Sequence, residues 1–201
     1  MKEVHHSSAP PFPSGPNAKS ASNQQAAFAA PTSFEGIFSM AISCYFQRLP
    51  GSRLAQVLRN EAAAEDIVDE LSETDELNLE IVRSWQLIHF LLTGAPWEHS
   101  GPLANAVLGG SEIPGTDSGY GAYRVNAAKD VQALCRQLDE LSADALWSRF
   151  DLSRVQAEQI YPEDWTGSHD DRQELQEDYE ALQAFLASAA QGNEAVLMFM
   201  S

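Results

Sequence analysis

Apolar and polar residues alternate with a regular spacing only after about residue 40. Residues 1–39 carry five prolines among serine, alanine, asparagine and glutamine, and show no period of 2 or 3.6. A segment of this composition buries too little apolar surface to offset its chain entropy. We therefore expect a disordered tail at 1–39 and a single folded domain at 40–201. Met40 stands at the boundary, which raises the hypothesis that translation naturally starts there.

Four segments of the domain have the composition of short strands. Ala41–Leu49 is rich in β-branched and aromatic residues and is closed by a proline-glycine pair. Leu103–Leu108 ends at a pair of glycines, and Tyr120–Val125 follows a glycine-rich turn. Ala195–Met200 reads AVLMFM, which we expect to form a closing strand.

Helical spacing dominates the rest of the domain. Ser52 can cap a short helix, and an acidic helix follows with Ile67, Val68 and Leu71 on its inner stripe. The remaining predicted helices are Glu80–Thr93, one capped by Asn126, Ala143–Phe150, Leu152–Gln159 and about Asp171–Ala190. The first of these is apolar on every side in its second half, which is typical of a helix surrounded by other elements.

Strands separated by helices in this order predict an α+β fold. We expect a small, largely antiparallel sheet of about four short strands, packed with five to seven helices. One of those helices, Glu80–Thr93, should be central and buried.

The net charge of −17 comes from two short segments. Residues 61–80 hold nine acidic and no basic residues, and residues 158–180 hold nine acidic residues and one arginine. Elsewhere the charges cancel, and no basic cluster is present to meet a nucleic-acid backbone or an anionic membrane. We therefore expect neither nucleic acid nor a membrane as a partner.

The cysteine content and the hydropathy pattern favour the cytoplasm. Cys44 and Cys135 both lie in apolar patterns, which favours two buried thiols over a disulfide. No apolar run reaches the roughly 18 residues needed to span a bilayer, and the N-terminus has no continuous apolar signal region. No cofactor or metal site is predicted, because His169 and the acids after it are explained more simply as a helix start.

Several strings of the sequence resemble the YfbM-like family of small bacterial proteins of unknown function. They occur in the family's order and cover essentially all of 40–201: AISCYFQRLP, WQLIHFLLTG, APWEH, LANAVLGG, SGYGAYRV, IYPEDW and YEALQAFL. The resemblance implies a cytoplasmic α+β domain with no established activity and no agreed catalytic residues. Two departures are the 39-residue extension and Ala122, where a proline would be unsurprising.

One candidate site is a pocket around the predicted central helix. His89 lies one turn after Trp85, so both project from the same side of that helix, and histidine titrates near neutrality. Other aromatic and polar residues fall in loops or at element ends, where binding groups concentrate. The full candidate set is Trp85, His89, Trp97, Tyr120, Tyr123, Arg124, Tyr161 and Trp165. The simpler interpretation is core packing, with the polar tips satisfied locally.

The second candidate site is an acidic surface made by the two charged segments. Its residues are Glu65, Asp66, Asp69, Glu70, Glu73, Asp170, Asp171, Glu174, Glu177 and Asp178. They are either solvated helix faces or a surface that docks a basic protein by charge attraction. The leading hypothesis is a non-enzymatic interaction protein, of which an immunity or inhibitor role is one instance. The alternatives are a small-molecule-binding or enzymatic domain using the aromatic pocket, and a weak homodimer rather than a monomer.

Overall fold

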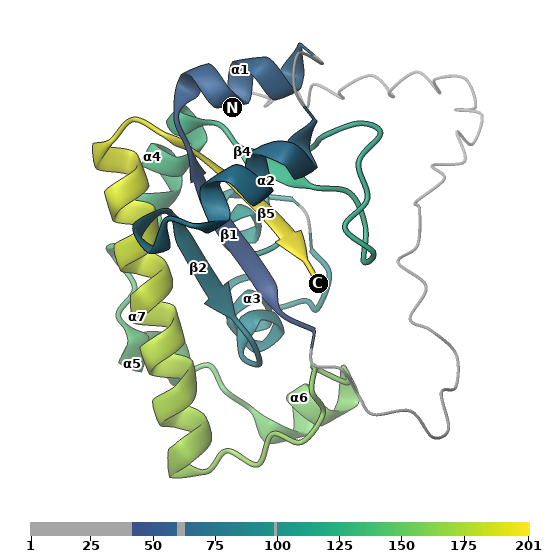
Figure 1. The fold of residues 1–201 in the computed structure, drawn as a ribbon. Helices are drawn as coiled ribbons and strands as arrows, with labels where there is room; N and C mark the ends of the chain where they lie inside the picture. The colour runs from purple at the N-terminus through teal and green to yellow at the C-terminus, as the bar shows by residue number, and fades with distance from the viewer. Residues whose placement is uncertain (1–41, 60–62, 99) are drawn as a thin grey trace, which may run out of the picture. The chain divides into compact units, whose positions relative to one another are not determined.

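Five strands form one antiparallel sheet within residues 42–59, 63–98 and 100–201, the part of the chain that the computed structural model describes (Figure 1). In space their order is β2-β1-β5-β4-β3, so the first and last strands of the domain pair at its centre. The strands are β1 (Cys44–Leu49), β2 (Asn78–Ile81), β3 (Ser111–Glu112), β4 (Arg124–Asn126) and β5 (Ala195–Met200).

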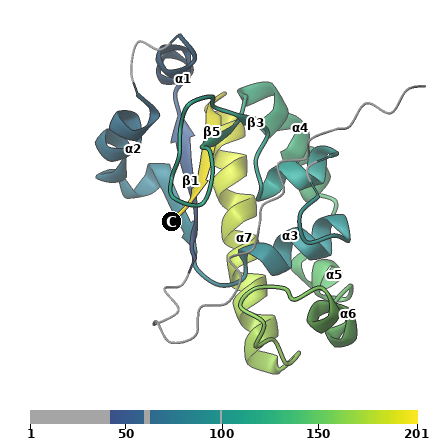
Figure 2. The same ribbon diagram turned by 90° about the vertical axis from the view of Figure 1, so that its right-hand side faces the viewer.

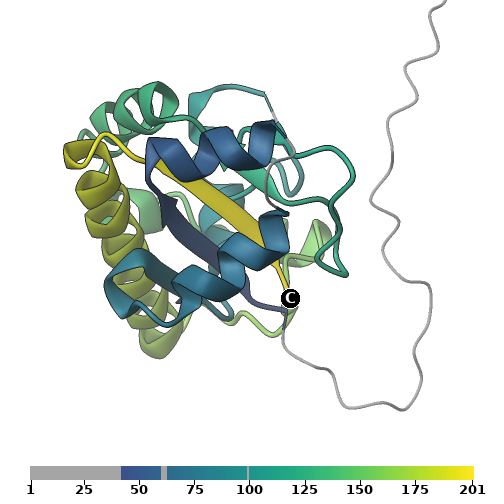
Figure 3. The same cartoon turned by 45° about the horizontal axis from the view of Figure 1, so that its top comes forward.

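Helices cover both faces of the sheet, but unequally. Seen from the side, two short helices lie on one face and the remaining helices on the other (Figure 2). The two are α1 (Gly51–Leu58) and α2 (Ala64–Ser72), which run along the sheet beside β5 (Figure 3). The other layer holds α3 (Trp85–Thr93), α4 (Ala128–Leu138), α5 (Ala143–Trp147), α6 (Leu152–Ala157) and α7 (His169–Gln191). Two 3₁₀ turns, η1 (Asp75–Leu77) and η2 (Pro102–Ala106), connect these elements.

Alternation along β1 and β5 creates a core on each side of the sheet. Cys44 and Phe46 of β1 join Val196 and Met198 of β5 in the large core under α3, α4 and α7. The intervening positions, including Leu49 and Leu197, belong to a smaller core under α1 and α2. Because side chains of a strand point alternately to opposite faces, the wholly apolar β5 serves both cores.

The central helix α3 is buried along almost its whole length. Every residue from Trp85 to Leu92 is buried, and Gly94 ends the helix in the left-handed conformation with φ of 84°. None of the described helices is both long enough and apolar enough to cross a bilayer. The α+β class, the small antiparallel sheet and the buried central helix predicted from the sequence are therefore confirmed.

One predicted helix begins too early, and one predicted strand is wrong. Glu80 and Ile81 belong to β2 rather than to a helix, because they pair with Tyr45 and Cys44 of β1. The helix then begins only at Trp85. Leu103–Leu108 is not a strand, because most of it lies in the 3₁₀ turn η2, whose first residue is Pro102. A short buried apolar run has no periodicity that separates strand from helix.

Two further boundaries move. The strand predicted at Tyr120–Val125 is confined to β4, because Gly119 and Gly121 adopt positive φ just before it. Asn126 ends β4 instead of capping α4, and its side-chain nitrogen donates to the Asn105 carbonyl oxygen at 2.8 Å. The predicted tail at 1–39 and the hypothesis about Met40 lie outside the described residues.

Replacing Leu182 by alanine tests the larger core. Leu182 is 0% exposed on α7, so Leu182→Ala should lower the free energy of unfolding by about 2–5 kcal/mol through lost burial and a cavity. Leu58→Ala is the matched control, because Leu58 also lies on a helix but is 59% exposed. It should change stability by about 0.5 kcal/mol or less in the same urea denaturation measurement. Equal losses in the two variants would contradict this assignment of the core.

Candidate functional site

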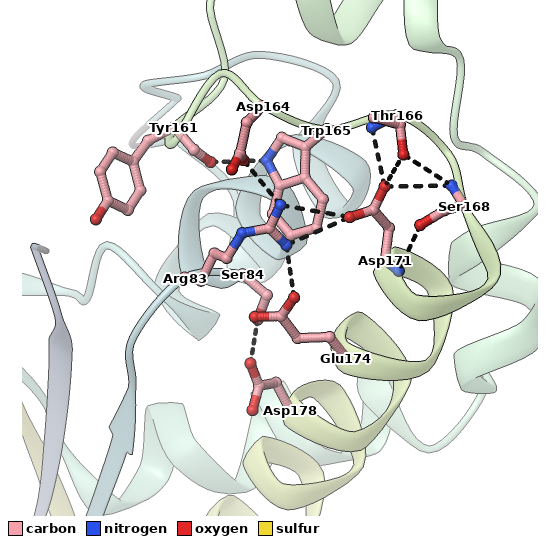
Figure 4. A network of polar contacts seen from close by, with 10 residues as sticks. All are labelled: Arg83, Ser84, Tyr161, Asp164, Trp165, Thr166, Ser168, Asp171, Glu174 and Asp178. Carbon is pink, nitrogen blue, oxygen red and sulfur yellow. Dashed lines mark hydrogen bonds and ion pairs between the residues drawn. The ribbon is translucent and has the colours of Figure 1, made fainter.

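Arg83 gathers the acids of the second charged segment into an internal network (Figure 4). It lies in the turn between β2 and α3, and its guanidinium packs over the Trp165 ring at 3.9 Å from the ring centroid. Its nitrogens donate to Glu174 at 2.5 Å, to Asp164 at 2.8 Å and to Asp171 at 3.3 Å. One cation therefore joins the loop before α7 to the first two turns of that helix.

Asp171 also forms the capping box that starts α7. Its carboxylate accepts hydrogen bonds from the backbone and hydroxyl of Thr166, at 2.9 and 2.7 Å, and from the backbone of Ser168. Ser168 in turn accepts from the Asp171 backbone, which completes the box. Burial alone would raise the pKa of this carboxyl, but the hydrogen bonds from Thr166 and Ser168 outweigh it and lower the pKa to about 2.

Asp178 is half-buried and forms a hydrogen bond within the fold. It accepts a hydrogen bond of 2.5 Å from Ser84, and burial raises its pKa although that hydrogen bond opposes the change. In the same predicted surface, Asp170 and Glu177 are exposed, whereas Glu174 is half-buried beside Arg83. The α7 half of the predicted acidic surface is thus in large part structural.

The structure brings together part of the predicted aromatic pocket. Trp85 stacks on Tyr161 at 5.7 Å between ring centroids and lies 6.1 Å from the ring of Trp97. The Trp165 indole donates to the Tyr161 carbonyl oxygen at 2.8 Å. Trp85 donates to the carbonyl of Ile42, and the Tyr161 hydroxyl accepts from the Ile42 backbone nitrogen. These polar tips therefore fasten the segment before β1 to the large core.

Three of the other predicted pocket residues lie away from this cluster, and the fourth, His89, is enclosed in the same helix as Trp85. Tyr123 belongs to the smaller core on the opposite face of the sheet, 5.0 Å from the ring of Phe199. Arg124 forms an ion pair with Glu112, Tyr120 is 39% exposed, and His89 is fully buried in α3. The eight predicted residues are thus distributed over both faces of the sheet and do not converge on one place.

A row of aromatic rings crosses the face of the sheet that α1 and α2 cover only in part. Strand register places Tyr45 of β1 opposite both Glu80 of β2 and Phe199 of β5. The Tyr45 and Phe199 rings stack at 5.1 Å, and Tyr123 continues the row on the far side of Phe199. The Tyr45 hydroxyl donates to the Glu80 carboxylate at 2.8 Å, so the row ends in a negative charge.

Beside this row lies a groove of about 400 Å³ between the sheet and the C-terminal end of α2. Aromatic rings, neutral amides and carboxylates share its lining: Tyr45, Gln47, Val68, Ser72, Asp75, Asn78, Leu79, Glu80 and Phe199. None of the eight predicted pocket residues is among them. Most lie on β1, β2 and η1, whose side chains are placed by the strand register and by the turn that follows α2.

The helix beside the groove carries the exposed half of the predicted acidic surface. Described residues 63–80 hold eight acidic and no basic side chains, and all eight are exposed. Within the described residues one of them forms an ion pair, Glu70 with Arg53 of α1. Burial first, and then the charges of Glu65, Asp69 and Asp117, raise the pKa of Tyr123. The negative field of α2 therefore reaches the aromatic row.

Sequence reasoning missed the groove, although one signal was present. Gln47 is the polar residue at an inward position of an otherwise apolar and aromatic strand, between Tyr45 and Leu49 on the same face. A buried amide in a strand indicates either a structural hydrogen bond or a binding group. In the described part of the chain no group of three or more His, Cys, Asp or Glu side chains is placed to hold a metal ion.

Comparison with known proteins identifies the fold but no activity. The model of a family described as a domain of unknown function, DUF1877, matches residues 40–199. A crystal structure of YfbM from Escherichia coli, described as a protein of unknown function, is similar with a TM-score of 0.64 and 23% sequence identity. The match covers 79% of this chain and 99% of that one. No curated protein matches. The resemblance to the YfbM-like family is thereby confirmed.

Replacing Asp171 tests the structural role of the Arg83 network. The Asp171 pKa is about 2 in the folded protein, compared with an ordinary value of 3.8 that we take for the unfolded chain. Ionised Asp171 therefore stabilises the fold above pH 4. That contribution is lost as the pH falls from about 4 to 2. We expect Asp171→Asn to lower the free energy of unfolding by about 2 kcal/mol at pH 7 and to flatten its pH dependence below pH 4.

Asp170→Asn is the control for this prediction, because Asp170 is exposed in the same first turn of α7. It loses only the helix-dipole contribution, about 1 kcal/mol or less. Denaturant unfolding measured from pH 2 to pH 7 separates the two variants. The same pH dependence in Asp171→Asn as in the wild type would contradict the assignment.

Proposed function

The chain belongs to the family of the domain of unknown function DUF1877, and we propose that it is a non-enzymatic protein that docks a basic protein partner. The docking surface is the acidic face, defined as the exposed carboxylates of residues 63–80 on α2, η1 and β2. An immunity or inhibitor role, in which a basic protein is neutralised, is one instance of this function.

The observation that carries the proposal is the different use of the two acidic segments. On α7, Arg83 and Ser84 engage Asp171, Glu174 and Asp178 within the fold. On the acidic face all of the described carboxylates are exposed, and one of them, Glu70, forms an ion pair with Arg53. Like charges held together without internal cations repel one another, and a basic partner relieves that repulsion while its approach is steered by charge.

Two further properties are part of the proposal. Burial raises the pKa of Cys44 and of Cys135, and both thiols are free, which supports a reducing compartment such as the cytoplasm. The charge of −17 disfavours self-association through the acidic face. We therefore propose that the protein is a monomer or a weak homodimer before its partner binds.

A lysine-glycine peptide tests docking on the acidic face. The probe is a fluorescently labelled peptide of alternating lysine and glycine, titrated with the full chain and followed by anisotropy at low and high salt. The variant Glu65→Gln, Asp66→Asn, Asp69→Asn, Glu73→Gln removes four charges from the acidic face. It should weaken binding at low salt about tenfold or more, because rim charges each contribute a few tenths of a kcal/mol or more.

The matched control removes four exposed charges from the other acidic segment: Glu158→Gln, Asp170→Asn, Glu177→Gln, Glu180→Gln. Its net charge equals that of the first variant, so a general charge effect would weaken both equally. We expect a change of about twofold or less for the control. Equal weakening of the two variants, or wild-type binding that does not fall as salt rises, would contradict the proposal.

A further inference from the structure

We infer that the groove beside the acidic face is a pocket for a single arginine side chain of the basic partner. The inference rests on the proposed function and adds the residue that the partner inserts. Three features of the lining carry it: a buried amide oxygen that lacks a donor, two carboxylates at the rim, and a stacked pair of aromatic rings.

The amide is that of Gln47, which is 1% exposed. Its Nε2 donates to the carbonyl oxygen of Val68 at 3.1 Å and to Oδ1 of Asn78 at 2.9 Å. A carbonyl can only accept, so the Val68 contact fixes which end of the amide is nitrogen. Asn78 is fixed as well, because its own nitrogen donates to the carbonyls of Leu71 and Thr74.

The Gln47 Oε1 atom is therefore an oriented acceptor, and among the described residues no donor lies within hydrogen-bonding distance of it. Leaving a buried acceptor unsatisfied costs free energy, which a donor from a ligand recovers. The other end of the same amide is held by Val68 and Asn78, which both line the groove. The missing partner is thus a donor, and we place it in the groove because Gln47 lines the groove together with Val68 and Asn78.

The rim is negatively charged, so the group that it binds must carry positive charge. Asp75 and Glu80 line the groove and are exposed, and Glu80 is already oriented by the Tyr45 hydroxyl. The described residues that line the groove include no cation. A group that donates hydrogen bonds and carries positive charge complements both the two carboxylates and the Gln47 acceptor.

The aromatic pair selects arginine over lysine. The Tyr45 and Phe199 rings are stacked with their planes 11° apart, and both residues are half-buried. A planar guanidinium packs on aromatic surface and presents five N–H donors in a fixed fork, whereas an ammonium is a more strongly hydrated point charge. The aliphatic stem of an arginine also fits against Val68 and Leu79, which are the apolar members of the lining.

Titration with acetyl-arginine amide tests the pocket. The full chain is followed by NMR, and we expect saturable shifts of the Gln47 side-chain amide and of the Phe199 ring. Asp75→Asn with Glu80→Gln should weaken this binding about tenfold, because hydrogen bonds to charged groups are lost. The matched control is Glu73→Gln with Glu76→Gln, two exposed acids of the same segment outside the groove lining, which should change affinity about twofold or less.

Two analogues decide the chemistry. Acetyl-citrulline amide has nearly the same shape without the charge, and acetyl-lysine amide with a free ε-amine has the charge without the planar fork. Both should bind at least about threefold more weakly than the arginine analogue. Equal binding of citrulline would overturn the role of the carboxylates, and equal binding of lysine would overturn the selection of arginine. No saturable shift at Gln47 with the arginine analogue would overturn the pocket itself.

The two proposals fail separately. The lysine-glycine peptide reports on the acidic face and contains no arginine, whereas the arginine analogue carries one charge and reports on the groove. If the peptide binds but the arginine analogue does not, the arginine pocket is contradicted and the docking surface is supported. If the arginine analogue binds but the peptide does not, the groove is a pocket for a cation, and the proposed docking of a basic protein is contradicted.

Discussion

The structure depends on one constraint: the two central strands bury side chains on both faces of the sheet. Cys44 and Phe46 point to one side of β1 and Leu49 to the other, and the apolar β5 does the same. A sheet of this kind needs a layer on each side to remove its apolar surface from water. The large layer around α3 and α7 does so fully, but α1 and α2 are short. The aromatic row and the groove lie where this second layer ends.

The same unequal layering separates structural charge from available charge. Arg83 is the only lysine or arginine between Arg59 and Arg124, and it faces the large layer, where it binds Asp164, Asp171 and Glu174. Within the small layer, Arg53 meets Glu70, and the other acids of residues 63–80 face solvent. Two acidic segments that look equivalent in composition therefore have different tasks. One closes a loop onto the start of α7, and the other faces solvent and contributes Asp75 and Glu80 to the lining of a groove.

Much of the fold could be predicted from the sequence because its strongest patterns are local. The i, i+4 stripe of α7, the apolar run of β5 and the all-round apolar half of α3 each depend only on neighbours along the chain. Glu80 and Ile81 were misassigned because pairing with β1, a partner far away in the sequence, outweighs their helical spacing. The candidate site was harder for the same reason. Gln47, Glu80 and Phe199 meet only through strand register, which composition does not report. Of the predicted aromatic pocket, Trp85, Trp97 and Tyr161 do meet, but Tyr123 alternates to the opposite face.

The central claim is that a basic partner meets the small layer and not α7, and a residue-by-residue map of contact tests it most directly. Backbone amide shifts of the full chain are recorded as the lysine-glycine peptide is added at low salt and again at high salt. The account predicts shifts concentrated in residues 63–80 and around Tyr45 and Phe199, which shrink as salt rises. Shifts of similar size along the exposed acids of α7, such as Asp170 and Glu177, would show attraction to net charge alone and would contradict it.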